Sequence, residues 1–211
     1  MNVFLYSASQ CFKNLLRQRT RFRVLALSVI IVSSAVSFTA SFTESSKAVL
    51  NEYLPYYAPD GYYIAEEDAA KNLPLTPNDV RTADRINAIF FKLQILCSAA
   101  WGAALLTYAK FSMGFRIPDA VIMNHCGVGT GIIAGSLFAE TLARGIFSYI
   151  TGILLGYLLN LAVFSSAAPP FMVPAFPSAK LIFTGIGIMT AVTAANTAMF
   201  AKKIKNSAKK F

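Results

Sequence analysis

The chain has few charged residues and few of the residue types that build catalytic centres. Only 14% of its 211 residues are charged, and it holds three cysteines and one histidine. Because the sequence offers no Ser/His/Asp set and no paired carboxylates in a catalytic arrangement, we expect no catalytic residue and no enzyme activity. His125 and Cys126 are adjacent, with no second pair nearby for tetrahedral coordination, so we expect no bound metal or cofactor.

A glycine-rich stretch at residues 127–131 has the composition of a phosphate-binding loop but not its context. A phosphate loop follows a strand and ends in Gly-Lys-Ser/Thr, because the lysine must reach the phosphates. Neither feature is present here. We therefore expect no nucleotide site in this chain.

Apolar residues are abundant instead, at 55% of the chain. This is more than a soluble core of this size buries, and lipid is the solvent that accounts for the excess. A helix needs about 20 apolar residues to cross the hydrocarbon layer. Four stretches qualify, which predicts an all-α integral membrane protein with four transmembrane helices, at residues 24–43, 86–109, 145–166 and 181–201.

Charges are distributed unequally among the segments that flank these spans. Residues 1–23 carry five cations and no acid, residues 202–211 carry five lysines, and residues 44–85 carry eight acids against four cations. The positive-inside rule therefore places both termini and the loop at 110–144 in the cytoplasm of a prokaryote, with the protein in the inner membrane. The net charge of +9 then fits anionic lipid headgroups, and we expect no nucleic-acid partner.

A cleaved signal peptide is the alternative interpretation of the N-terminus. Its apolar run of about 20 residues is longer than the roughly 7–15 of a signal-peptide core, which favours a retained anchor. By this topology Cys11, Cys97 and Cys126 all lie inside the cell or within a span. No disulfide is expected.

The segments outside the spans have patterns of their own. Helical spacing of apolar residues in 1–23 predicts an amphipathic helix on the inner surface. Residues 44–85 form a small, tyrosine-rich outer segment, whose last part begins a helix at Pro77 and leads as a stalk into the second span. Lys92 is expected to snorkel to the outer surface, with an ion-pathway role as the alternative. Four prolines predict a short, stiff outer loop at 167–180.

The cytoplasmic loop at 110–144 contains a further short helix. It runs from Arg116 to Met123, because Pro118 and Asp119 suit a first helical turn, and Gly127 ends it. Val121 and Ile122 belong to its apolar side.

The third span carries two further patterns. At its start, Glu140 and Arg144 are spaced i, i+4 in the order that favours an ion pair. Further along, Gly152 and Gly156 lie one turn apart and make a candidate dimer seam, because glycines let another helix approach closely.

Three segments together match one known family in order and spacing. They are Phe12-Lys13-Asn14-Leu15-Leu16-Arg17-Gln18-Arg19, then Arg116-x-x-Asp119-Ala120-x-Ile122-x-x-x-x-Gly127, then Glu140 thirteen residues beyond that glycine. They resemble the surface helix, the "RxxEIxxLRAxGA" coupling segment and the Glu of the "LLEA" segment in the FtsX/MacB (type VII) family of ABC-transporter permeases. The chain departs from the family in its short outer segment and in the absence of basic residues directly after Gly127.

The resemblance implies the membrane subunit of an ABC transporter, with ATP hydrolysed by a separate ABC ATPase. The ATPase contact would involve the coupling residues Arg116, Pro118, Asp119, Val121, Ile122, Met123 and Gly127. Movement would pass to the outer stalk and drive export or extraction of a substrate. Since four spans are few for a transporter, we expect a second permease copy or a paralogue.

Two other functions stay open. The first is a non-transporting, FtsX-like regulator of an envelope or cell-wall partner. A small channel or secondary transporter is less expected, because such proteins need polar groups at mid-membrane. Asn160 and Asn196 are the few candidates for that role, and interhelical hydrogen bonding explains them equally well.

Overall fold

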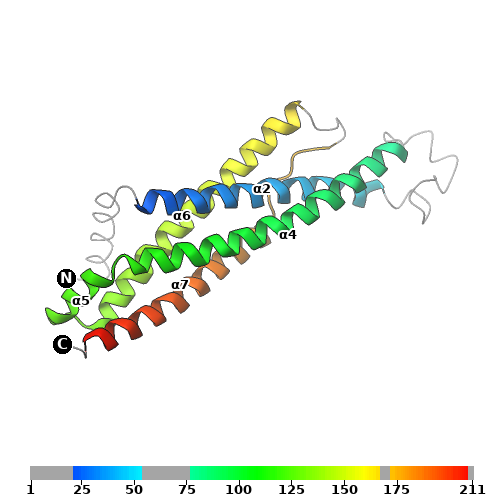
Figure 1. The fold of residues 1–211 in the computed structure, drawn as a ribbon. Coiled ribbons are helices and arrows are strands. Elements are labelled where there is room, and N and C mark those ends of the chain that lie inside the picture. Colours follow the sequence, from blue (N-terminus) through cyan, green and yellow to red (C-terminus); the bar gives the residue numbers. More distant parts are fainter. Residues whose placement is uncertain (1–20, 54–76, 167–171, 209–211) are drawn as a thin grey trace. The chain divides into compact units, whose positions relative to one another are not determined.

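The computed structural model describes residues 21–53, 77–166 and 172–208. Within these ranges the regular structure is five helices and no strand. The helices are α2 (Arg21–Tyr53), α4 (Pro77–Gly114), α5 (Ile117–His125), α6 (Thr130–Ser166) and α7 (Ala179–Ala208) (Figure 1). The predicted surface helix lies almost wholly outside these ranges, as do the tyrosine cluster, Pro169, Pro170 and the last two lysines.

Four of these helices, α2, α4, α6 and α7, are long and apolar enough to cross a membrane. The shortest, α7, has 30 residues and is about 45 Å long at 1.5 Å per residue, against a hydrocarbon layer of about 30 Å. Each of the four predicted spans falls inside one of them. The described part of the chain thus has the architecture of an all-helical, multi-pass membrane protein.

The third span belongs to a longer helix than its hydropathy indicated. We expected that span to begin near Gly145, whereas α6 begins at Thr130 and includes Gly131 and Gly135. Glycine lowers helix propensity, but tertiary packing outweighs it where an apolar face is buried. Here Ile133 and Leu137 are buried in an apolar cluster.

The described residues form two compact units. The first unit takes in the start of α2 as far as Val32, residues 101–151, and α7 from Lys180. The second unit takes in the rest of α2, the first part of α4 as far as Ala100, the end of α6 from Gly152, and the described residues that follow α6 as far as Ala179.

The first unit is held by an apolar cluster and by close contacts at two glycines. The cluster joins α4, α5, α6 and α7 through Met113, Ala120, Ile133, Leu137, Phe200 and Ile204. A Cβ at Gly145 would lie 2.7 Å from Met189 Sδ, and one at Gly185 would overlap the Tyr149 hydroxyl. That hydroxyl donates a hydrogen bond to the Leu181 carbonyl over 3.2 Å. The first part of α6 therefore packs directly on α7.

The second unit is held by contact of α2 with α6 and by stacked aromatic rings. The Ser37 hydroxyl donates to the Ile153 carbonyl over 2.8 Å, across the two helices. The Phe42 ring lies 4.4 Å from that of Phe90 on α4 and 4.8 Å from that of Phe164 on α6. Aromatic pairs at these separations add to the free energy gained from burial alone.

Gly156 is a point of very close approach between α2 and α6. A Cβ at this position would overlap the Ser34 carbonyl oxygen and lie 2.7 Å from Ser37 Cβ. Gly152 and Gly156 are both buried. The candidate dimer seam is thus occupied at Gly156 by a helix of the same chain.

At the far end of α2, the second unit has an apolar cluster of its own. It joins Val49 and Leu50 of α2 to Val80 and Ala83 of α4, with Met172 from the segment after α6. The Ala175 amide also donates to the Ser45 hydroxyl over 3.0 Å. The end of α2 and the start of α4 are therefore packed together beyond the apolar spans predicted from hydropathy.

Candidate functional site

The site lies in the first unit, where α4 ends and α5 begins. α4 ends at Gly114, and Arg116 is the N-cap residue of α5. Its carbonyl accepts the Ala120 amide over 2.9 Å, and a proline in the first turn supplies a φ angle suited to helix entry. Gly127, after the end of α5, has φ +86°, a conformation that favours glycine. A short helix is thus present where the sequence predicted one, but it runs from Ile117 to His125 rather than from Arg116 to Met123.

Arg116, Glu140 and Arg144 form a buried cluster of charges. Arg116 Nη2 donates to Glu140 Oε1 over 2.7 Å, and Arg144 Nη2 lies 2.6 Å from the same oxygen. Each of the three side chains is less than a tenth exposed. A buried carboxylate is tolerated when it is paired and hydrogen-bonded, because its desolvation is then offset. The i, i+4 pair expected from the sequence is present and has a second arginine bound to it.

Polar groups continue from this cluster along one side of α4. Tyr108, Ser112 and Arg116 follow at intervals of four residues, and all are buried. The Tyr108 hydroxyl donates to the Thr141 carbonyl over 3.1 Å, and the Ser112 and Thr141 hydroxyls lie 3.4 Å apart. Glu140 and Thr141, adjacent on α6, thus contact Tyr108 and Ser112 near the end of α4 and Arg116 at the start of α5.

The two sides of α5 have different surroundings. Ala120 is only 1% exposed and lies in the apolar cluster with residues of α6 and α7. Ile122 is 61% exposed and Met123 44%, and Pro118 and Asp119 are exposed as well. α5 is therefore fixed through Ala120 and exposes Ile122 on the opposite side, while Asp119 and Met123 are exposed between these two sides.

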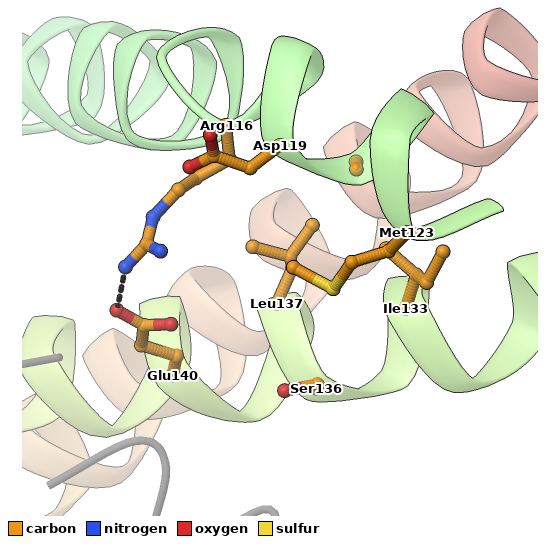
Figure 2. A pocket seen from close by; sticks show the side chains of 8 residues that line it. Arg116, Asp119, Met123, Ile133, Ser136, Leu137 and Glu140 are labelled. Carbon is orange, nitrogen blue, oxygen red and sulfur yellow. Dashed lines mark hydrogen bonds and ion pairs between the residues drawn. The ribbon is translucent and has the colours of Figure 1, made fainter. Parts of the chain in front are cut away.

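A small cavity lies between α5 and α6 (Figure 2). Figure 2 shows Arg116 reaching from the start of α5 towards Glu140 on α6, while Met123, Ile133 and Leu137 gather at the other side of the cavity. Its volume is about 60 Å³. Pockets for drug-sized ligands are several times larger, at about 300–1,000 Å³. The cavity thus fits water or one inserted side chain better than a small-molecule substrate.

The structure brings together only some of the residues that the sequence singled out. Arg116, Asp119, Met123 and Glu140 line this one cavity, and Arg144 joins through Glu140. Ile122 is exposed and Val121 is half-buried. Gly152 and Gly156 belong to the second unit.

The sequence did not predict the pairing of Arg116 with Glu140. The two residues are 24 positions apart, and each was assigned a separate role. A signal was present nonetheless, because charged residues are rare in so apolar a chain and opposite charges near the ends of adjacent helices tend to pair. Tyr108 was missed because hydropathy treats it as part of an apolar span, and Ser112 was missed because it lies in the loop predicted after that span.

Comparison of the chain with protein-family models, with curated proteins and with solved structures gave no match in any of the three. The resemblance to FtsX/MacB permeases therefore rests on the three sequence segments and their spacing.

Proposed function

We propose that this chain is the permease subunit of an ABC transporter of the FtsX/MacB type and that α5 docks on a separate ABC ATPase. The observation that carries the proposal is the two-sided character of α5. One side is fixed by Ala120 and by the Arg116–Glu140 ion pair, while Ile122 is exposed on the opposite side and Met123 is 44% exposed at the edge of the cavity between α5 and α6. An exposed apolar pair on a fixed helix suits helix-in-groove recognition.

A force on α5 would reach the long helices by two routes. The backbone joins α5 to α4 within three residues, and the buried ion pair joins its N-cap to α6. Helices with packed side chains transmit displacement, because protein interiors have low compressibility. At 38 residues α4 is about 57 Å long, so it exceeds the roughly 30 Å thickness of the hydrocarbon layer.

In this proposal α5 and both termini lie in the cytoplasm, in the inner membrane of a prokaryote. The apolar cluster of Val49, Leu50, Val80, Ala83 and Met172 then forms the base of an outer stalk. A second permease, identical or paralogous, completes the transporter, which exports or extracts a substrate.

The stalk also favours a second candidate, an FtsX-like regulator without transport. Movement carried to that cluster would act on an envelope or cell-wall partner rather than on a substrate. Cells that lack the protein would then show an envelope or division defect, whereas loss of a transporter would make them accumulate a compound.

Replacing Ile122 by glutamate is expected to abolish capture of the proposed ABC ATPase. A charge placed in an apolar contact would weaken binding on the order of tenfold or more, because central interface residues dominate affinity. The measurement is co-purification from membranes. Asn206→Glu puts the same charge at an exposed position on α7 and should leave capture unchanged. Equal capture by both variants would rule out α5 as the docking helix.

Single cysteines at Asn78 and Lys205, in a chain whose own cysteines are replaced, are expected to react with membrane-impermeant maleimide from opposite sides of the inner membrane. Both side chains are exposed, and the two positions lie in segments of opposite charge balance. In intact cells whose outer membrane has been made permeable, the Asn78 position should label and the Lys205 position should label only after lysis. Labelling of both cysteines without lysis would contradict the proposed orientation.

A further inference from the structure

α2 contains a tandem four-residue repeat. Ser37-Phe38-Thr39-Ala40 is followed at once by Ser41-Phe42-Thr43-Glu44, and Ser33 and Ser45 extend the serine spacing on both sides. Four residues are close to one helical turn, so the repeated side chains lie above one another on one side of the helix. The four serines are at most 1% exposed, which means that this side is fully packed.

The contacts made by the repeat are nearly interchangeable between its two copies. Phe90 of α4 lies 4.4 Å from the Phe42 ring and 6.2 Å from the Phe38 ring. The threonines bond to their own helix: Thr39 donates to the Ala35 carbonyl and Thr43 to the Thr39 carbonyl, each over 2.9 Å. Because donor and acceptor both lie on α2, a displacement of the whole helix would leave these two bonds intact.

Hydrogen bonds of Ser37 and Ser45 to other segments help to hold this serine row in position. Ser37 donates to the Ile153 carbonyl, and Ser45 accepts from the Ala175 amide. Between them, the Ser41 hydroxyl has no hydrogen-bond partner among the described residues, nor does the amide of Asn160, which is fully buried on α6. A polar row that is only partly bonded specifies its register less strongly than a fully bonded one. Gly156, moreover, presents no side chain to obstruct α2 as it slides.

We infer that α2 has a second register on α6, displaced by four residues, or about 6 Å, towards its own C-terminal end. In that register Ser33 replaces Ser37 as the donor to Ile153, and Ser41 replaces Ser45 as the acceptor from Ala175. Both interhelical bonds are re-formed, while Ser37 moves to the place without a partner. Phe38 takes the place of Phe42. One-turn displacements of this kind are a known form of two-state switching.

The opposite displacement is blocked by charge. It would bring Glu44 to the place of Ala40 and Lys47 to the place of Thr43, and both places are only 2% exposed. Burying either charge without a partner is strongly unfavourable. In the permitted direction these residues instead take the places of Ala48 and Asn51, which are exposed. Buried charge therefore opposes one direction of displacement and not the other.

The second register is the less populated of the two. It replaces Val49 and Leu50 in the apolar cluster with Ser45 and Ser46. It also puts Val36 in the space of the smaller Ala40 and Phe42 in the space of the fully buried Ser46, so the neighbours of Ser46 must move. Loss of apolar burial and overpacking both cost free energy. An input of free energy is then needed to make this register dominant. The inference does not require the proposed ATPase, because every contact used lies within the second unit.

Disulfide trapping in the full-length protein in native membranes tests the inference. Cys11, Cys97 and Cys126 are first replaced by alanine. Ile153→Cys is then combined with Ser37→Cys, Ser33→Cys or Ser41→Cys, and disulfide formation is followed on gels under mild oxidation. The three pairs report the observed register, the inferred register and the blocked register. A disulfide needs Cα atoms within about 7 Å, so a 6 Å displacement separates them.

We expect the Ser37 pair to form fastest and the Ser33 pair to accumulate several-fold faster than the Ser41 pair. A minor state on the order of 1–10% populated is trapped in this way, because each disulfide removes it from the equilibrium. Equal, slow formation of the Ser33 and Ser41 pairs would overturn the inference. So would failure of the Ser37 pair to form, since the observed register would then be wrong. Loss of ATPase capture leaves all three readouts unaffected, so the two proposals fail separately.

Discussion

Gly156→Val is expected to separate α2 from α6 and to cost more stability than overpacking usually does. Extra methyl groups in a packed core cost about 1–3 kcal/mol when neighbours can adjust. At Gly156 the first atom met is the Ser34 backbone carbonyl oxygen, followed by Ser37 Cβ and the Phe38 amide nitrogen. Backbone cannot rotate out of the way as a side chain can, so α2 as a whole must move. The Ser37 hydrogen bond to Ile153 would then be lost as well.

The measurement is thermal unfolding of the purified protein in detergent, with yield of folded protein as a second readout. Gly135→Val is the matched control, because Gly135 lies on the same helix and a Cβ there would have no neighbouring atom within 4 Å. We expect the Gly135→Val control to have a Tm close to that of the wild type. We expect Gly156→Val to be recovered in low yield and to have a clearly lower Tm. Similar unfolding of the two variants would contradict the close packing of α2 on α6.

The membrane spans could be predicted from the sequence because they depend on composition alone. A run of apolar residues crosses lipid wherever its neighbours lie, so hydropathy located all four helices. The Glu140–Arg144 pair was equally predictable, since i, i+4 spacing on a helix fixes the distance. The position of α5, though not its last residues, followed from Pro118 and Gly127, whose backbone preferences are local.

The contacts between helices could not be predicted in this way. Gly152 and Gly156 indicated that some helix approaches closely, but a small surface does not specify its partner, and α2 of the same chain lies there. The pairing of Arg116 with Glu140 depends on how α4, α5 and α6 fold back on one another. Burial of the serines on α2 could not be predicted from hydropathy either, because hydropathy averages over all sides of a helix.

Glu140→Met is expected to be among the most destabilising single substitutions in the described part of the chain. It removes the carboxylate oxygen that both Arg116 Nη2 and Arg144 Nη2 approach within 2.7 Å. Two buried guanidinium groups would then face each other without that acid. Removal of one partner from a buried ion pair costs about 3–5 kcal/mol, much of it from the charge left behind. We expect a large loss of Tm in detergent and poor accumulation in membranes.

The triple variant Arg116→Met, Glu140→Met, Arg144→Met separates the charge effect from lost packing. It removes the same carboxylate but leaves no buried charge, and replacing a whole buried ionic cluster by apolar residues of similar volume is often nearly neutral. The triple variant should therefore regain most of the stability that Glu140→Met loses. If the cluster also connects α5 to α6 in the working protein, the triple variant will fold yet fail in function. A triple variant less stable than the single one would show that these charges stabilise the helices by more than mutual neutralisation.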